Sequence, residues 1–474
     1  MAWVSLGVWA TNRRGRRTYF TNTGGWLVLA AALSLCSGCI LAPAGTAAQR
    51  KELEQHRFYE LPPDQRAGPP LPQPAVWRDV LARAFWVNGD LEAAYFQWKA
   101  AVTRIDQAAA WPNSNVMVSY SYLFSGGHMK SWDRTTLGAG FDPSMNLELP
   151  IKARQAGKVA LQEARVAAER FRKAKFDLQR RVLESYYDLA LVEERSRIQR
   201  ENVELLGQLV RSAQARVEAG APQQDLLKAQ IEHRLAQNEL DSMKAQARSQ
   251  RAILNALLNR PAEEPLEMPE ELPARPAAAD DRLIAMGVAA NPDLAELAAQ
   301  VAGRKEALEL ARLRYVPDII PSFAMTGGIS QSVGAAVMLP TNVPAIRGAI
   351  AEANAMLHES RAMERQLRQD RAAAFVTALV FMRSAEHQAA VLEGDVLPLA
   401  RQAMDNSHQA YAAGTASYLE LIDTQRLLLN LRLTLAQLRA EREKRLAELE
   451  SLAGVDVETL GTPPASATPS ESNP

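Results

Sequence analysis

The chain repeats itself, and this internal duplication limits the possible folds more than any other feature of the sequence. The stretch "VEAGAPQQDLLKAQ" at 217–230 resembles "YAAGTASYLELIDTQ" at 411–425. Asn259 and Gly454, where the two copies end, are 195 positions apart. Self-similarity at a fixed separation indicates a repeat architecture, so each copy is expected to build the same order of elements.

The beginnings of the two copies are also alike. Residues 80–91 and 283–294 both predict a short amphipathic helix followed by an Asn-x-Asp-Leu helix start. Asp90 and Asp293 bring an acid into the first helical turn, where it interacts favourably with the helix dipole. In each copy this helix of about twenty residues is expected to end at a proline and to be followed by strands.

Proline-rich stretches separate the repeats from the rest of the chain, since such composition favours extended linkers and tails. The predicted organisation is a signal peptide at 1–38, an extended N-terminal arm at 39–76, the first repeat at 77–259, a linker at 260–280, the second repeat at 281–454 and a disordered tail at 455–474.

The N-terminal segment has the features of a secretion signal. Four arginines between positions 13 and 17 precede a short apolar run, residues 26–35, as in the charged and apolar regions of signal peptides. Ser37-Gly38-Cys39 then resembles a bacterial lipoprotein cleavage box, in which Cys36 stands where leucine is usual. That resemblance implies lipidation of Cys39. The alternative is an uncleaved membrane anchor, for which the run is short.

The composition excludes several classes of function. The chain is 47% hydrophobic but only 6% aromatic, which is typical of long helices. Its 54 basic and 54 acidic residues balance, whereas a nucleic-acid-binding surface needs basic excess. No phosphate-binding glycine loop, His-Glu-x-x-His motif or pair of Cys-x-x-Cys motifs occurs, so the sequence predicts no enzyme, no cofactor and no metal site. After Cys39 no stretch resembles a transmembrane helix, and any membrane insertion must use another structure.

Four segments alternate strictly between apolar and polar residues, which predicts strands with one apolar face. They lie at 115–124 and 136–149 in the first copy and around 323–325 and 333–339 in the second. The predicted lipid-facing residues of the first copy are Val116, Val118, Tyr120, Tyr122 and Phe141.

Two interpretations of these strands are open. One is a soluble sheet packed on a core. The other is a membrane barrel, whose strands need about 9–11 residues each and separate lipid from water. Four strands cannot close a barrel, and an open sheet edge is not tolerated in lipid. The barrel interpretation therefore requires further subunits.

The helices are too long for an ordinary globular domain. Residues 154–218 contain no proline, and apolar residues such as Leu178 and Val182 recur at steps of three and four. About 65 helical residues span roughly 100 Å, and the spacing indicates coiled-coil packing. A shorter helix is expected after Gly220, and the second copy is expected to run unbroken over 347–413. A solvated coiled coil or scaffold is the alternative.

The ordered set of helix, two strands, long helix, glycine turn and helix, present twice, resembles the TolC-type outer-membrane efflux factors over residues 77–454. The resemblance implies a mainly α fold with a small membrane β part, in which a homotrimer shares a twelve-stranded barrel and an α-helical barrel. It implies a passive exit duct in the bacterial outer membrane that extends into the periplasm. The implied partners are outer-membrane lipid, a periplasmic adaptor and an inner-membrane pump of the RND type.

The resemblance also implies roles for the two tips. Gly220 and Gly414 would be the hairpin turns, because a sharp reversal needs backbone angles that only glycine adopts readily. Asp225 and Tyr411 match positions that link the two tips in the closed state of the family.

Glu420 and Asp423 match the acidic ring at the tunnel mouth and are the predicted pore constriction. They are three residues apart and hence share one helix face. Such a ring favours cations, while the alternative is two solvated surface acids. The sequence does not identify the cargo, so a drug, a metal ion or a protein stays possible. The alternative function is a lipid-anchored periplasmic coiled-coil structural protein without a pore.

Overall fold

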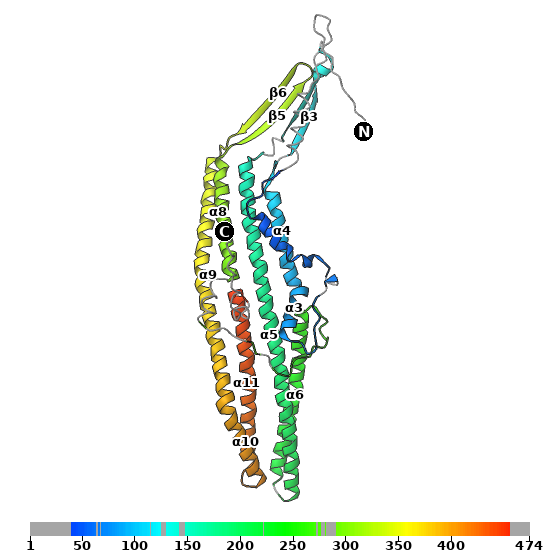
Figure 1. The fold of residues 1–474 in the computed structure, drawn as a ribbon, viewed down its shortest axis with the longest axis vertical. Helices are drawn as coiled ribbons and strands as arrows, with labels where there is room; N and C mark the ends of the chain where they lie inside the picture. The colour runs from blue at the N-terminus through cyan, green and yellow to red at the C-terminus, as the bar shows by residue number, and fades with distance from the viewer. Residues whose placement is uncertain are drawn as a thin grey trace, which may run out of the picture. The chain divides into compact units, whose positions relative to one another are not determined.

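The computed structural model describes residues 39–62, 65–66, 68–113, 115–124, 129–141, 147–220, 222–271, 274–275, 280 and 291–455 (Figure 1). The predicted signal peptide, residues 281–290 and the predicted tail after Val455 lie outside these residues. The chain divides into two compact units. The strand unit comprises Met1–Ala44, Arg104–Ala160 and Glu306–Glu352, and the helical unit comprises Gly45–Thr103, Leu161–Lys305 and Ala353–Pro474.

The strand unit contains a four-stranded antiparallel sheet in the order β3-β4-β5-β6 (Figure 1). Its strands are β3 (Val116–Tyr122), β4 (Thr135–Phe141), β5 (Asp318–Thr326) and β6 (Ser330–Met338). Each repeat contributes one hairpin, and the two repeats meet where β4 pairs with β5. The prediction of a mainly helical chain with four strands is confirmed.

The second predicted strand is shorter than expected. The alternation suggested a strand over 136–149, but β4 ends at Phe141 and residues 147–149 have no strand structure. The helix α5 begins at Pro150, where the fixed φ of proline suits a first helical turn. Leu147 is buried although it is not in a strand, so its apolar character reflects packing and not sheet alternation.

Polar contacts fix the base of the sheet. The Lys152 ammonium donates to the Asp318 carboxylate at 2.8 Å, and both side chains are largely buried. The Trp111 indole donates to the Glu148 carbonyl at 2.9 Å. The short strand β1 (Cys39–Ile40) pairs with β2 (Ala110–Trp111). The residues after the predicted cleavage site are thereby attached to the strand unit. This unit also holds the 3-10 helices η3 (Trp132–Arg134) and η4 (Leu313–Tyr315).

The helical unit consists of long, roughly antiparallel helices (Figure 1), some of which continue into the strand unit. The helices are α2 (Thr46–Glu54), the 3-10 helix η1 (Arg57–Glu60), α3 (Trp77–Val87), α4 (Gly89–Ala108), α5 (Pro150–Glu218), α6 (Gln223–Leu257), α8 (Pro292–Arg312), α9 (Val343–Val391), the π-helical turn η5 (Leu392–Val396), α10 (Leu397–Ala412) and α11 (Tyr418–Ala453).

Equivalent asparagines begin the corresponding helices of the two repeats. The Asn88 side-chain oxygen accepts from the Leu91 backbone N–H, and its amide donates to the Leu257 carbonyl. Asn291 accepts in the same way from Leu294, and its amide donates to the Leu452 carbonyl. Each asparagine is thus a helix N-cap that also holds the end of the last helix of its own copy. Leu257 and Leu452 are 195 positions apart, which is the repeat separation.

The sequence predicted an extended N-terminal arm, but part of the arm is helical. Its first part forms α2, because "TAAQRKELE" consists largely of good helix formers. Among the described residues between α2 and Trp77, η1 is the one further stretch of regular secondary structure. The arm is fastened by the Tyr59 hydroxyl, which donates to the Phe85 carbonyl at 2.6 Å.

The linker between the repeats is anchored by a buried arginine. Arg275 is 2% exposed and forms ion pairs with Glu443 at 3.1 Å and Glu450 at 2.8 Å. Its guanidinium also lies 5.4 Å from the ring centroid of Trp77 in α3. Both carboxylates are buried as well. A linker arginine therefore connects the first helix of repeat 1 to the last helix of repeat 2.

The second long rod differs from the prediction of an unbroken helix over 347–413. It consists of α9 and α10 joined by the π-helical turn η5. In the first repeat, α5 is one helix of 69 residues. Pro398 is the second residue of α10, just after η5, and the period of apolar residues alone did not reveal the interruption.

Candidate functional site

The register of the sheet gathers apolar side chains on one face. Two neighbouring rows across the four strands make this apolar face: Val118, Ala139, Phe323 and Val333, then Tyr120, Leu137, Met325 and Gln331. Val118, Tyr120 and Val333 are 76%, 68% and 86% exposed. Exposed apolar surface of this kind marks an interaction site in a folded protein.

The opposite face carries small and hydroxyl-bearing side chains. The two rows on this polar face are Ser119, Gly138, Ala324 and Ser332, then Ser121, Thr136, Thr326 and Ser330. The Thr136 and Thr326 hydroxyls are 3.0 Å apart across the junction of the two repeats. A Cβ atom at Gly138 would lie too close to the Ser119 hydroxyl, so a larger residue there would force the Ser119 side chain to move.

The predicted lipid-facing residues of β3 and β4 lie on the apolar face. Val116, Val118 and Tyr120 are exposed, whereas Tyr122 and Phe141 are half-buried. In the described part of the chain, β3 and β6 each pair with a strand on one side only. Unpaired strand edges present free N–H and C=O groups to another chain. The sheet is therefore two-faced and open at both edges.

The two helical hairpins of the helical unit turn at glycines. Gly220 follows α5 with φ 99°, and Gly414 follows α10 with φ 76°. Both φ values are positive, and side-chain-bearing residues rarely adopt such angles. In Figure 1 the α5–α6 hairpin and the α10–α11 hairpin end next to each other. We call these ends the first tip and the second tip.

Apolar packing joins the two tips. The shared cluster of buried residues is Leu206, Leu209, Ala213, Ala229, Ala236, Met404, Tyr411, Tyr418, Leu421 and Ile422. Leu421 is fully buried, which is worth about 1.5–3 kcal/mol relative to an exposed side chain. The members of the cluster come from α5, α6, α10 and α11. Both repeats therefore contribute to one small core.

Arg216 makes the polar link between the tips. Its guanidinium lies 4.4 Å from the Tyr411 ring centroid and donates to the Tyr411 carbonyl at 3.2 Å. Tyr411 in turn packs edge-on against Tyr418, with centroids 6.1 Å apart. Burial, together with the charges of Glu232 and Asp225, raises the pKa of the Tyr418 phenol.

The expected link between Asp225 and Tyr411 takes a different form. Among the described residues, no hydrogen bond or ion pair is found between these two side chains, and Asp225 acts on Tyr418 through its charge. Sequence reasoning missed Arg216. The usable signal was the repeat itself, because Arg216 and Tyr411 are 195 positions apart and equivalent positions of the two copies face each other at the tips.

Glu420 and Asp423 lie on the exposed side of α11. Glu420 also has a local role, because its carboxylate accepts from the Ser417 N–H at 2.9 Å while the Ser417 hydroxyl accepts from the Glu420 N–H at 3.3 Å. This reciprocal pair is a capping box that begins α11. Asp423 lies 4.0 Å from Arg426, and Arg426 forms an ion pair with Glu232 of α6. Both acids are accessible, and the geometry of one chain is compatible with a pore ring and with solvated acids.

The described residues lack both a cluster of metal ligands and a membrane-spanning helix. No group of three or more His, Cys, Asp or Glu side chains is placed to hold a metal ion in these residues. No helix in the same part of the chain is long and apolar enough to span a membrane.

The sequence matches a described protein family. A sequence model of the family "Outer membrane efflux protein" matches residues 81–260, which cover most of the first repeat. Residues 81–260 thus carry the sequence pattern of the outer membrane efflux protein family. The cobalt-zinc-cadmium resistance protein CzcC of Cupriavidus metallidurans is 24% identical to this protein over 306 residues, which make up 61% of this chain and 71% of the relative.

Solved structures have the same fold. The outer-membrane channel OprN superimposes with a TM-score of 0.67 at 16% identity, over 85% of this chain and 92% of that chain. The outer membrane protein VceC of Vibrio cholerae gives 0.68 at 17% identity, over 80% and 96%. The chain thus has the fold of an outer-membrane channel, and the match of its first repeat to a family of efflux proteins supports the prediction that it is not an enzyme.

Proposed function

We propose that three copies of this protein close one barrel in the outer membrane, with twelve strands in all, and that their helices form the duct below it. The observation that carries the proposal is the sheet with one apolar face, one polar face and two open edges. Lipid outside and water inside account for the two faces. Pairing between copies accounts for the edges, because an open edge is not tolerated in lipid.

Exposed apolar side chains on the helices support association of copies. On α6, Leu227, Ile231 and Leu235 recur every four residues and are each more than half exposed. On α9, Val376 and Val380 have the same spacing and are also exposed. Ridges at this spacing pack against neighbouring helices.

Lysine substitutions on the two faces of β3 test the barrel. A lysine on the lipid face of a membrane barrel costs about 2–4 kcal/mol near the bilayer midplane. Tyr120→Lys should therefore reduce membrane integration and assembled trimer, measured by membrane fractionation and by cross-linking. Ser119→Lys, one residue away on the polar face, is the matched control and should assemble. Equal assembly of both variants would contradict the barrel and favour a coiled-coil protein without a pore.

We further propose that Glu420 and Asp423 form the constriction at the mouth of the duct, with six carboxylates in the trimer. Their exposure on one side of α11 supports this role. A ring of carboxylates attracts cations and repels small anions. Glu420 also caps α11, so an alanine there would confound loss of charge with loss of the cap.

The double variant Glu420→Gln with Asp423→Asn separates these effects, since glutamine can replace glutamate in a capping box. In planar bilayers it should lose cation preference and block by multivalent cations, while the amount of trimer stays unchanged. Glu448→Gln, another helix-surface acid of α11, is the control. If ion selectivity is the same in all three proteins, the two acids are ordinary surface residues.

We propose divalent metal cations as the cargo, delivered by an inner-membrane pump of the RND type through a periplasmic adaptor that meets the tip turns. The relative CzcC, described as a cobalt-zinc-cadmium resistance protein, supports this class, and exposed acids at the mouth suit it. Deleting the gene should lower tolerance to cobalt, zinc or cadmium and leave tolerance to organic drugs unchanged. The reverse pattern would indicate a drug duct.

Lipid attachment at Cys39 is a separate proposal, based on the sequence around it. The backbone of Cys39 pairs with Trp111 in the strand unit, which would keep an acylated N-terminus near the sheet. Mass spectrometry of the mature N-terminal peptide should find the acyl chains at Cys39. A Cys39→Ser variant should lack them. An unmodified mature N-terminus that begins elsewhere would exclude the anchor.

A further inference from the structure

The second long rod departs from regular helix at one π turn, which contains a glycine and is followed two residues later by a proline. The backbone forms a π-helical turn over Leu392–Val396, and π turns inside long helices are frequent at functional positions. Gly394 lies within the turn, and an added Cβ atom there would meet nothing within 4 Å, so close packing does not require this glycine. Pro398 has no N–H to donate to the carbonyl four residues before it. The rod is weakened at this point by its own sequence.

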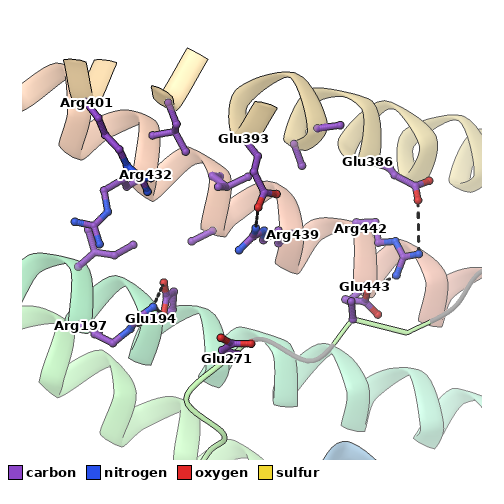
Figure 2. A pocket seen from close by; sticks show the side chains of 17 residues that line it. Glu194, Arg197, Glu271, Glu386, Glu393, Arg401, Arg432, Arg439, Arg442 and Glu443 are labelled. Carbon is purple, nitrogen blue, oxygen red and sulfur yellow. Dashed lines mark hydrogen bonds and ion pairs between the residues drawn. The ribbon is translucent and has the colours of Figure 1, made fainter. Parts of the chain in front are cut away.

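A cavity of about 1100 Å³ lies beside the turn (Figure 2). It is bounded by α5, α11 and the α9–η5–α10 rod, and its apolar lining includes Ile198, Leu397 and Leu435. The hollow is partly open, and most of the side chains that line it are charged. The rod therefore has room to move on this side.

Two ion pairs bridge the cavity between the rod and α11 (Figure 2). Glu393 of the π turn pairs with Arg439 at 2.7 Å, and Glu386 pairs with Arg442 at 3.8 Å. The Glu393 and Arg439 side chains are about half exposed. An exposed pair of this kind contributes little and is screened by salt. In the second pair Arg442 is largely buried and also pairs with Glu443. Such weak pairs favour one position of the rod but allow it to move away.

We propose that Leu392–Pro398 is a joint at which α10 and the second tip move, latched by the Glu393–Arg439 and Glu386–Arg442 pairs. The first tip has no equivalent, because α5 continues as one helix past the corresponding level. The two tips share a buried cluster and the Arg216–Tyr411 contact. Movement at the joint would therefore displace Tyr411, on the second-tip side of that contact, while Arg216 stays in place. The inference concerns one chain and does not depend on the number of copies in the channel.

Hydrogen–deuterium exchange of the full-length protein in detergent tests the joint. Glu393→Gln removes the latch charge and should speed exchange over 392–398 about 1.5- to 5-fold, the range expected for an exposed ion pair. Exchange over 405–412, near the second tip, should rise with it, while 206–213 of α5 should not change. About 1 M salt should reproduce the effect in the unmodified protein.

Glu193→Gln is the matched control, since Glu193 pairs with Arg251 at 2.8 Å and joins α5 to α6 in the first repeat. It should leave exchange at 392–398 and 405–412 unchanged. Deleting Gly394 should have the opposite effect and make the joint more rigid. A π turn holds one residue more than the α-helix, so the deletion should restore regular helix and slow exchange over 392–398 at least tenfold. Equal effects of Glu393→Gln and Glu193→Gln, or unchanged exchange after the deletion, would overturn the proposal.

Discussion

The two long rods come from one duplicated unit, yet they differ in continuity. In the first repeat α5 runs from Pro150 to Glu218 without interruption. In the second repeat the π turn η5 and Pro398 divide the rod into α9 and α10. Duplication has preserved the order of elements and the glycine turns at the tips. It has not preserved stiffness, which depends on a few local residues and can change without altering the fold.

The opening helices of the repeats differ in a second way. In α4 the buried face carries Tyr95 and Trp98, and the N-terminal arm packs against them. The equivalent positions of α8, counted from the Asn-x-Asp-Leu starts, are Ala298 and Val301. Trp98 stacks on Phe171 of α5, with centroids 5.6 Å apart. The first repeat thus has an aromatic core covered by the arm, whereas in the second repeat Ala298 is exposed and Val301 is half-buried.

The largest expected effect concerns Arg275, which joins the two repeats. Arg275→Met would leave Glu450 and Glu443 buried without their linker partner. Removing one member of a buried ion pair costs about 3–5 kcal/mol. The variant should unfold at markedly lower denaturant, followed by circular dichroism in detergent, and the linker should become sensitive to protease.

Arg248→Met is the control for this experiment. Arg248 pairs with Glu263 at 2.9 Å, but both side chains are well exposed, and such surface pairs contribute little to stability. If both variants unfold at the same denaturant concentration, the buried cluster does not hold the repeats together.

A smaller effect separates the two tips. Gly414, at φ 76°, is close to the left-handed region that other residues adopt at a cost of about 1–2 kcal/mol. Gly220, at φ 99°, is further from it. Gly220→Ala should therefore destabilise its hairpin more than Gly414→Ala, measured as the loss of unfolding free energy. Because neither glycine has atoms within 4 Å of an added Cβ, the difference reports backbone strain and not collision.

Gly348→Ala provides the reference for these two variants. Gly348 lies within α9 and also has open space around an added Cβ, and alanine favours a helix by about 1 kcal/mol over glycine. This variant should be slightly stabilised. If Gly220→Ala lowers the unfolding free energy no more than Gly348→Ala does, the turn can change its conformation freely.

The sequence was most informative where one residue pattern has one structural outcome. Alternation predicted the two faces of β3, and glycine indicated the turns after α5 and α10. It was least informative where the outcome depends on contacts between distant segments. The pairing of Arg275 with Glu443 and Glu450, and the position of Arg216 over Tyr411, require the three-dimensional packing of both repeats. The extent of β4 was overestimated because apolar residues such as Leu147 continued the alternation into a segment that packs for another reason.

The smallest expected effect tests the difference between the aromatic core of the first repeat and the second repeat, which has no aromatic residue at the equivalent positions Ala298 and Val301. Burial, and then the charge of Lys175, lower the pKa of His56, whose ring packs 4.9 Å from that of Phe171. The folded protein therefore binds fewer protons than the unfolded chain as pH falls through about 6.5. Stability from this group is complete above that pH and decreases below it.

The loss should appear as a decrease in melting temperature between pH 7.5 and pH 5.5 that is smaller in His56→Phe than in the unmodified protein. His387→Gln, at an exposed position of α9 in the second repeat, should leave the pH dependence unchanged. Because the phenylalanine ring can occupy the same aromatic cluster without a titrating group, its packing should persist at both pH values. Identical pH dependence in His56→Phe and the unmodified protein would show that the arm and the aromatic core do not respond to this proton. The two repeats would then differ in packing alone and not in their sensitivity to acid.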